Sequence, residues 1–119
     1  MTAYLANGFS PSMLPLPAYV QFTNIDIKEF CQVVTGGVQN AIGHQGTADL
    51  INGLCGSNLQ VNRASIKANA GDQIYIITLL YRLEEGKVLK SDEIQRLYEE
   101  GKVQFIKAKV YGPLMEELW

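Results

Sequence analysis

One near-continuous apolar segment places the tightest limit on the fold of this chain. Residues 74–81 read Ile-Tyr-Ile-Ile-Thr-Leu-Leu-Tyr, and only Thr78 interrupts the run. Apolar residues at almost every position are typical of a strand that is covered on both faces. The segment therefore predicts a central strand, which needs other layers to cover it.

Segments on both sides of this run alternate between strand and helix patterns. Short stretches rich in β-branched and aromatic residues predict further strands, which we expect at residues 3–6, 19–23, 38–42, 59–67 and 103–111. A turn is expected over residues 69–72 because Asn, Gly and Asp cluster there. The sheet should thus draw on the whole length of the chain.

Three segments carry helix signals. Asp26 followed by Glu29 resembles a capping box, and apolar residues at helical spacing then continue to the glycine pair at 36–37. A second helix is expected over residues 47–55 and a third from residue 91 to 101, each with a glycine at its end. The fold class is therefore α/β (α+β), with a mixed sheet packed by about three helices.

The chain has room for one domain. Its 119 residues can bury a single core, so we assign residues 1–119 to one domain, with residues 113–119 as a tail that has no assignment. No apolar run approaches the roughly 18 residues of a membrane span, and the N-terminus lacks a basic segment leading into an apolar one. We expect no membrane contact and a cytoplasmic protein, in the host cytoplasm if a virus encodes it.

The charge argues against a protein that grips long nucleic acids. Ten Lys and Arg against 12 Asp and Glu give a net charge of −2, whereas such proteins need a positive excess to neutralise phosphates. A compact anionic ligand remains compatible because it needs only a local site. We therefore expect no long nucleic acid as a partner.

The two cysteines, Cys31 and Cys55, each fall on the apolar stripe of an expected helix. Cysteine used in this way behaves as a small hydrophobe, which suits a reducing cytosol. We expect free thiols, with a disulfide as the alternative. One histidine and two distant cysteines do not form a zinc pattern, so we expect no metal and no cofactor.

His44 is the only histidine, and histidine is the side chain that ionises near neutral pH. It lies in a glycine-flanked loop just before the second expected helix, whose N-terminus offers free N–H groups and suits phosphate. A histidine there could donate a proton to a leaving oxygen. The alternative is a histidine that only caps the helix or forms a structural hydrogen bond.

Two arginines and a glutamate are further candidates. Arg63 is expected in the 59–67 strand, where a guanidinium could grip phosphate or simply face water. Arg82 and Glu85 follow the central strand, where ligands of α/β folds collect, with a surface ion pair as the alternative. The first loop adds three residues that form turns and can also contact ligands: Asn7, Ser10 and Ser12.

Several strings, in order along nearly the whole chain, resemble one family. They are Tyr4-Leu5-Ala6-Asn7-Gly8-Phe9-Ser10, Asn40-Ala41-Ile42-Gly43-His44 with Thr47 and Leu50, Leu54-Cys55-Gly56, Asn62-Arg63 and Arg82-Leu83-Glu84-Glu85-Gly86-Lys87. They are similar to the viral anti-CRISPR ring nucleases, which degrade the cyclic tetra-adenylate messenger of type III CRISPR defence and have cellular and prophage members.

The resemblance implies a homodimer that binds cyclic tetra-adenylate across its cleft. It implies that His44 is the general acid, with Arg82 and Glu85 beside it. Ligand contacts are implied at seven positions: Asn7, Ser10, Ser12, Gly46, Thr47, Arg63 and Thr78. Ser12, the Gln45-Gly46 pair and Thr78 differ from the residues of some relatives, which bears on base contacts and affinity and not on the reaction.

RNA chemistry then suggests a mechanism without metal. The 2′-hydroxyl attacks the adjacent phosphorus, arginines and the helix N-terminus stabilise the charge, and His44 protonates the leaving 5′-oxygen. Glu85 is either a general base or the group that keeps His44 protonated. Two cuts would give linear di-adenylates that end in a 2′,3′-cyclic phosphate.

Three rival readings belong to other classes. The chain could be a non-catalytic sponge for a cyclic nucleotide or a small DNA-binding regulator, although its charge gives no sign of a basic face. A plain interaction domain is the third, and it leaves His44 and the loop arginines without a role.

Overall fold

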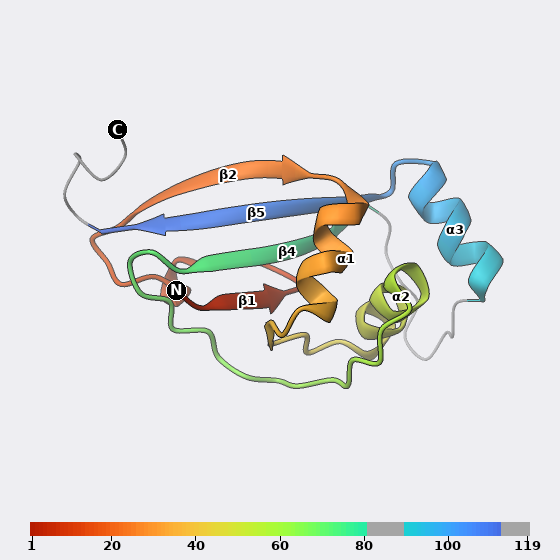
Figure 1. Ribbon diagram of the computed structural model, residues 1–119, viewed down its shortest axis with the longest axis horizontal. Helices are drawn as coiled ribbons and strands as arrows, with labels where there is room; N and C mark the ends of the chain where they lie inside the picture. The colour runs from red at the N-terminus through yellow and green to blue at the C-terminus, as the bar shows by residue number, and fades with distance from the viewer. Residues whose placement is uncertain (81–89, 113–119) are drawn as a thin grey trace.

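The apolar run forms the centre of a five-stranded mixed sheet. The computed structural model describes residues 1–80 and 90–112. The strands are β1 (Ala3–Ala6), β2 (Tyr19–Ile25), β3 (Gln39–Asn40), β4 (Gln73–Leu79) and β5 (Val103–Tyr111), in the order β2-β5-β4-β1-β3 (Figure 1). β4 pairs in parallel with β1 and antiparallel with β5, and β3 extends the parallel half beyond β1. The prediction of a central strand is thus confirmed, although Tyr81 lies outside the described residues.

Three α-helices and one short 3-10 helix accompany the sheet. They are α1 (Ile27–Thr35), α2 (Gln45–Cys55), α3 (Ser91–Glu99) and η1 (Pro11–Met13). The predicted start of α1 is confirmed, because the Asp26 carboxylate accepts a hydrogen bond from the Glu29 N–H at 2.8 Å. The α+β class is therefore confirmed. Within the described residues no helix is long and apolar enough to cross a membrane.

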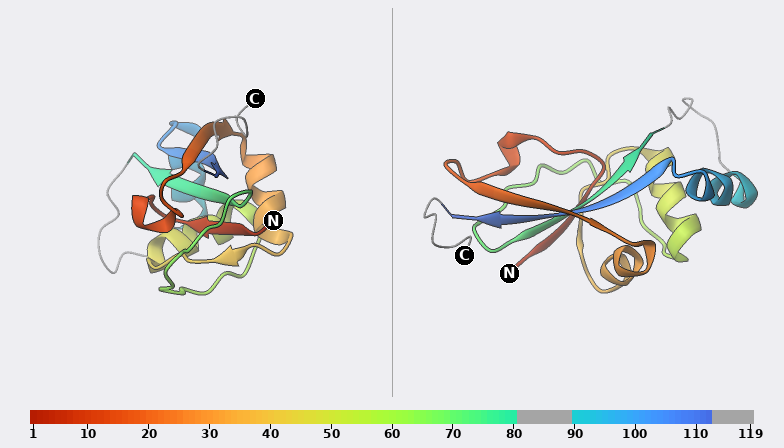
Figure 2. Two further views of the ribbon diagram at one scale, coloured as in Figure 1. Left: turned by 90° about the vertical axis from the view of Figure 1, so that its left-hand side faces the viewer. Right: turned by 90° about the horizontal axis from the view of Figure 1, so that it is seen from above.

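Alternation along the strands divides the core into two parts. Tyr75 and Ile77 of β4 point to one face, where they pack with residues of α1 and α2 such as Phe30 and Ile51. Ile74 and Ile76 point to the other face, which irregular segments cover. Figure 2 shows α1 and α2 on one side of the sheet and η1 on the other. Among the described residues the α-helices cover only one face, so the second face needs η1 and its loops to exclude water.

The turn at residues 69–72 is confirmed, and a buried carboxylate holds it. Asp72 is 5% exposed, and its two oxygens accept from the Thr2 and Asn69 N–H groups at 2.9 and 2.8 Å. A buried carboxylate needs such partners because it has left water. Asp72 therefore ties the N-terminus to the start of β4.

The predicted strand at 59–67 is wrong. This segment has no strand assignment, although it runs beside residues 40–43. Only one backbone bond joins the two segments, from the Asn62 N–H to the Ile42 carbonyl, and the other bonds come from the side chains of Asn40, Asn62 and Arg63. A repeating ladder therefore does not form. The expected strand at 38–42 likewise shortens to β3, because the Asn40 side chain takes the Ile42 N–H out of the sheet.

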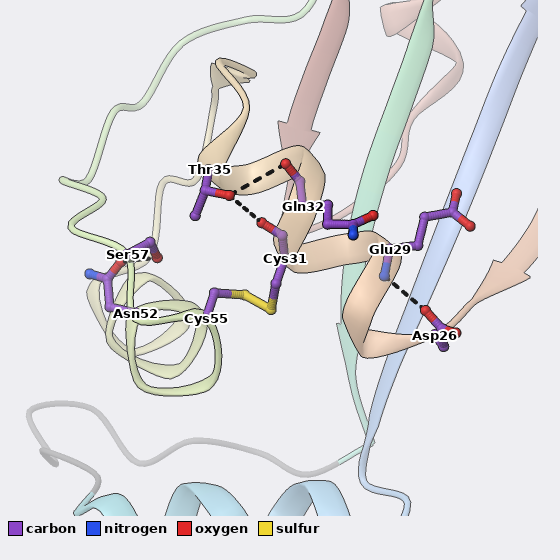
Figure 3. Close-up of a disulfide and its surroundings, with 8 residues drawn as sticks. All are labelled: Asp26, Glu29, Cys31, Gln32, Thr35, Asn52, Cys55 and Ser57. Carbon is purple, nitrogen blue, oxygen red and sulfur yellow. Dashed lines mark hydrogen bonds between the residues drawn. A yellow bond between two sulfur atoms is a disulfide. The ribbon is translucent and has the colours of Figure 1, made fainter.

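The expectation of free thiols is also wrong. Cys31 of α1 and Cys55 of α2 form a disulfide, with their Cα atoms 5.1 Å apart (Figure 3). The apolar stripes on which both cysteines lie are the surfaces through which the two helices meet, so the packing that half-buries them also brings the sulfurs together. The bond fixes α2 to α1.

Candidate functional site

The carboxyl ends of the parallel strands gather most of the sequence candidates. β1 ends at Ala6 and is followed by Asn7, while β3 ends at Asn40 and leads through Gly43 to His44. Neighbouring parallel strands direct the segments that follow them to the same edge of a sheet. This edge is therefore where polar groups from separate parts of the chain meet.

His44 is the N-cap of α2, because the helix begins at Gln45, two residues earlier than the sequence predicted. Its Nδ1 atom lies 3.2 Å from the Thr47 nitrogen, whose N–H it accepts, and 3.3 Å from the Thr47 hydroxyl oxygen. The side chain is exposed, whereas Thr47 is buried. The capping role foreseen as the alternative is therefore present. Nδ1 serves the cap, and Nε2 is left for other partners.

The start of α2 carries donors and no carboxylate. Within residues 1–80 and 90–112, the N–H groups of Gln45 and Gly46 have no hydrogen-bond partner. The first turn of α2 contains no acidic residue. Unpaired N–H groups together with the positive end of the helix dipole favour an anion at this position.

The peptide of Gly43 joins three parts of the site. Its N–H donates to the Asn7 side-chain oxygen at 3.3 Å, and its carbonyl accepts from Arg63 Nε at 3.1 Å. A Cβ at Gly43 would lie 3.2 Å from Arg63 Cγ, which leaves little room for a side chain. Asn7, Arg63 and the His44 loop are thereby fixed relative to one another.

Two asparagines that the sequence reading did not select hold Arg63 in place. The Asn62 amide donates to the Asn40 carbonyl at 2.8 Å, and the Asn40 amide donates to the Gln60 carbonyl at 2.6 Å. These crossed bonds hold the segment before Arg63 against the chain that leaves β3. Asn62 stood beside Arg63 in the family-like strings, which is the one signal that could have found it.

A cavity of about 450 Å³ opens on the loop-covered face next to this cluster. Asn7, Ser10, Ser12 and Lys67 contribute polar groups to its lining. The Ser10 and Ser12 hydroxyls lie 3.0 Å apart, and Lys67 Nζ donates to the Ser12 carbonyl at 3.3 Å. Because Asn7 both lines the cavity and bonds to Gly43, the cavity and the His44 loop share one wall.

The structure brings together five of the ten predicted site residues, and two more, Ser10 and Ser12, line the adjoining cavity. Asn7, His44, Gly46, Thr47 and Arg63 surround the loop at Gly43, although Arg63 lies on an irregular segment and not on the predicted strand.

Thr78 stands apart from this cluster, because it lies near the end of β4 and no hydrogen bond of its side chain joins it to the described site residues. Arg82 and Glu85 lie outside the described residues.

The opposite end of the sheet offers a contrasting environment. A second cavity, of about 390 Å³, is lined there by Glu29, Gln73 and Tyr75 among others. The Tyr75 hydroxyl donates to Gln73, and burial, with a smaller contribution from Glu29, raises the pKa of Tyr75 above its usual value. That group stays protonated at neutral pH.

The chain is similar to proteins of archaeal viruses. A family model described as STIV B116-like matches residues 3–105. ORF116 of Acidianus filamentous virus 1 is 42% identical over 114 residues, which are 94% of this chain and 98% of that protein. ORF117 of Acidianus two-tailed virus is 33% identical over 66 residues, 56% of each chain. The solved structure of B116 from Sulfolobus turreted icosahedral virus superposes with a TM-score of 0.81 at 40% identity, covering 92% of this chain and 99% of that one.

Proposed function

Because the chain belongs to the STIV B116-like family of archaeal viral proteins, we propose that it is a viral ring nuclease. In this proposal it cleaves cyclic tetra-adenylate without a metal and so switches off type III CRISPR signalling. The substrate comes from the family-like strings in the sequence. The chemistry comes from the cluster around Gly43.

The observation that carries the proposal is the position of the only imidazole. His44 is exposed at the start of α2, beside two N–H groups that have no partner among the described residues. It is also next to the Gly43 peptide that Arg63 contacts. A group that can give up a proton thus lies beside groups suited to phosphate oxygens. This is the combination that leaving-group protonation in phosphodiester cleavage requires.

The proposed reaction uses the substrate's own nucleophile. The 2′-hydroxyl of one adenylate attacks the adjacent phosphorus, and the bond from phosphorus to the 5′-oxygen breaks. Arg63 and the first N–H groups of α2 stabilise the extra negative charge on phosphorus, and His44 Nε2 gives its proton to the leaving oxygen. In the proposal Arg82 is a second positive group that stabilises the charge on phosphorus. Glu85 either takes the proton of the 2′-hydroxyl or keeps His44 charged.

The proposal includes a homodimer. A two-fold axis through a cyclic ligand would place one His44 at each of two opposite phosphates, so a single histidine in each chain suffices for two cuts. The adenylates would then extend toward the cavity that Asn7, Ser10 and Ser12 line. The expected products are two linear di-adenylates that end in a 2′,3′-cyclic phosphate.

The test is incubation of the purified protein with cyclic tetra-adenylate in excess EDTA, followed by chromatography and mass measurement of the products. The proposal predicts linear di-adenylates at the same rate with and without EDTA. Binding without any linear product would instead identify a sponge. Binding to duplex DNA with no affinity for the ring would identify a DNA-binding regulator.

A further inference from the structure

We propose that the Thr47 hydroxyl is a positioning group that accepts the Nδ1 proton of His44 whenever the imidazole carries one. The ring could then change its protonation state without leaving the start of α2. The catalytic consequence rests on the proposed function. The position of the proton does not, and it can be measured on its own.

The geometry around Nδ1 presents two partners of opposite kind. The Thr47 N–H, 3.2 Å away, can only donate. The Thr47 hydroxyl oxygen, 3.3 Å away, can donate or accept. Both belong to one residue that is 4% exposed in the first turn of α2. Nδ1 of the imidazole therefore lies near one group that can only donate a hydrogen bond and one group that can donate or accept.

The two states of the ring need different partners. A neutral imidazole with its proton on Nε2 accepts from the Thr47 N–H and caps the helix. A charged imidazole carries a proton on Nδ1, which the N–H cannot accept, and the positive end of the helix also opposes the charge. Only an acceptor at Nδ1 can offset this, and among the described residues the Thr47 hydroxyl is the one within reach.

The other charged groups near the ring do not serve Nδ1. The segment before β4 contributes Arg63, which is bonded to the Gly43 carbonyl, and the loop after β1 contributes the neutral Asn7. On α2 itself, Asp49 accepts from the Gln45 side chain at 2.8 Å. Within residues 1–80 and 90–112, therefore, no carboxylate is bonded to the imidazole.

The proposed cleavage step makes use of this arrangement. When the charged ring gives its Nε2 proton to the leaving 5′-oxygen, it becomes a neutral imidazole with the remaining proton on Nδ1. The Thr47 hydroxyl holds that proton before and after the step, so the ring keeps its orientation during transfer. A new proton from water at Nε2 then restores the acid.

The test is an NMR titration of the one histidine in ¹⁵N-labelled protein. Thr47→Val keeps the backbone cap and the shape but removes the hydroxyl, and Thr47→Ser keeps the hydroxyl. We expect the His44 titration midpoint of Thr47→Val to fall by about 0.5 pH unit, the effect of losing a modest hydrogen bond to the charged form. Thr47→Ser should titrate like the unaltered protein.

An equal midpoint for Thr47→Val and the unaltered protein would overturn the proposal. If Thr47→Val does not fold, the Nδ1 proton of the charged ring in the unaltered protein still decides, because a proton held by the Thr47 hydroxyl should exchange more slowly with water than the Nε2 proton. An Nδ1 proton that exchanges as fast as the Nε2 proton would overturn the proposal as well.

The cleavage assay separates this inference from the proposed function. The pH at which cleavage falls off should shift by the same amount as the titration midpoint in Thr47→Val. If the unaltered protein cleaves nothing, the nuclease assignment fails, while the NMR comparison still decides the role of the hydroxyl.

Discussion

At the scale of single residues, His44 and Arg63 divide the work of the site. His44 Nδ1 caps the helix, which leaves Nε2 for the substrate of the proposed reaction. Arg63 is exposed and is held by one bond from Nε to the Gly43 carbonyl, so the outer nitrogens of its guanidinium are available for an anion. Each side chain thus uses one atom for structure and keeps another for a ligand.

Replacing Arg63 tests the second half of this division. Arg63→Gln should weaken binding and cleavage of cyclic tetra-adenylate by about tenfold, because it removes a charge-assisted contact with phosphate at an exposed position. Binding and cleavage by Arg63→Lys should lie between those of the unaltered protein and those of Arg63→Gln, since lysine keeps the charge but lacks the planar guanidinium. Titration calorimetry and initial rates provide the measurement. Unchanged binding by Arg63→Gln would show that the arginine has no part in the site.

At the scale of elements, two cross-connections fix the site to the sheet. The disulfide joins α2 to α1, and the amides of Asn40 and Asn62 join the segment before Arg63 to the end of β3. Both connections act on segments that a sheet ladder does not hold. The arrangement of the site therefore also depends on side chains that do not belong to the cluster around Gly43.

Loss of the disulfide should destabilise the protein without altering its fold. The cysteines are 24 residues apart, and a loop of that length corresponds to about 3 kcal/mol in the chain-entropy model. For a domain of this size we expect reductant to lower the melting temperature by about 10 °C. A variant with both cysteines replaced by serine is the control, since reductant should not affect it. Two reactive thiols in the untreated protein would contradict the bond.

Removal of the Asn62 amide should affect the site more than the fold. Asn62→Ala loses the 2.8 Å bond to the Asn40 carbonyl but keeps the backbone bond to Ile42. We expect a loss of about 1 kcal/mol in unfolding free energy and a clear rise in KM. Asn58→Ala is the matched control, because Asn58 is exposed and its side chain makes no hydrogen bond among the described residues. Equal KM values for Asn62→Ala and Asn58→Ala would show that the Asn62 side chain does not support the site.

The local patterns of the sequence predict the elements well where one segment decides the outcome. The Asp26 cap, the glycine after α2 and the apolar β4 run all act within a few residues. The 59–67 segment misled because Val61 and Ile66 resemble strand residues, while the bonds that hold it reach across about 20 residues to β3. The disulfide likewise depends on how α1 meets α2, and the Thr47 hydroxyl on where the ring lies. Contacts of this kind join segments that are distant in the sequence, so local patterns do not predict them.

At the scale of the whole molecule, the fold places the one histidine of the chain at one edge of the sheet. The parallel half of the sheet and the start of α2 bring Asn7, His44 and Arg63 together, and the adjoining cavity has room for part of a nucleotide. Two copies related by a two-fold axis would present two such edges to one cyclic ligand. The proposed cleavage therefore depends above all on proton transfer from His44.

The most direct test is single-turnover cleavage of cyclic tetra-adenylate by His44→Asn. Asparagine is a good N-cap, so this variant should keep α2 and its melting temperature while losing the acid. We expect the cleavage rate to fall by about 10²–10⁴-fold, with the affinity for the ring little changed. A folded His44→Asn protein that cleaves the ring at the rate of the unaltered protein would contradict the account.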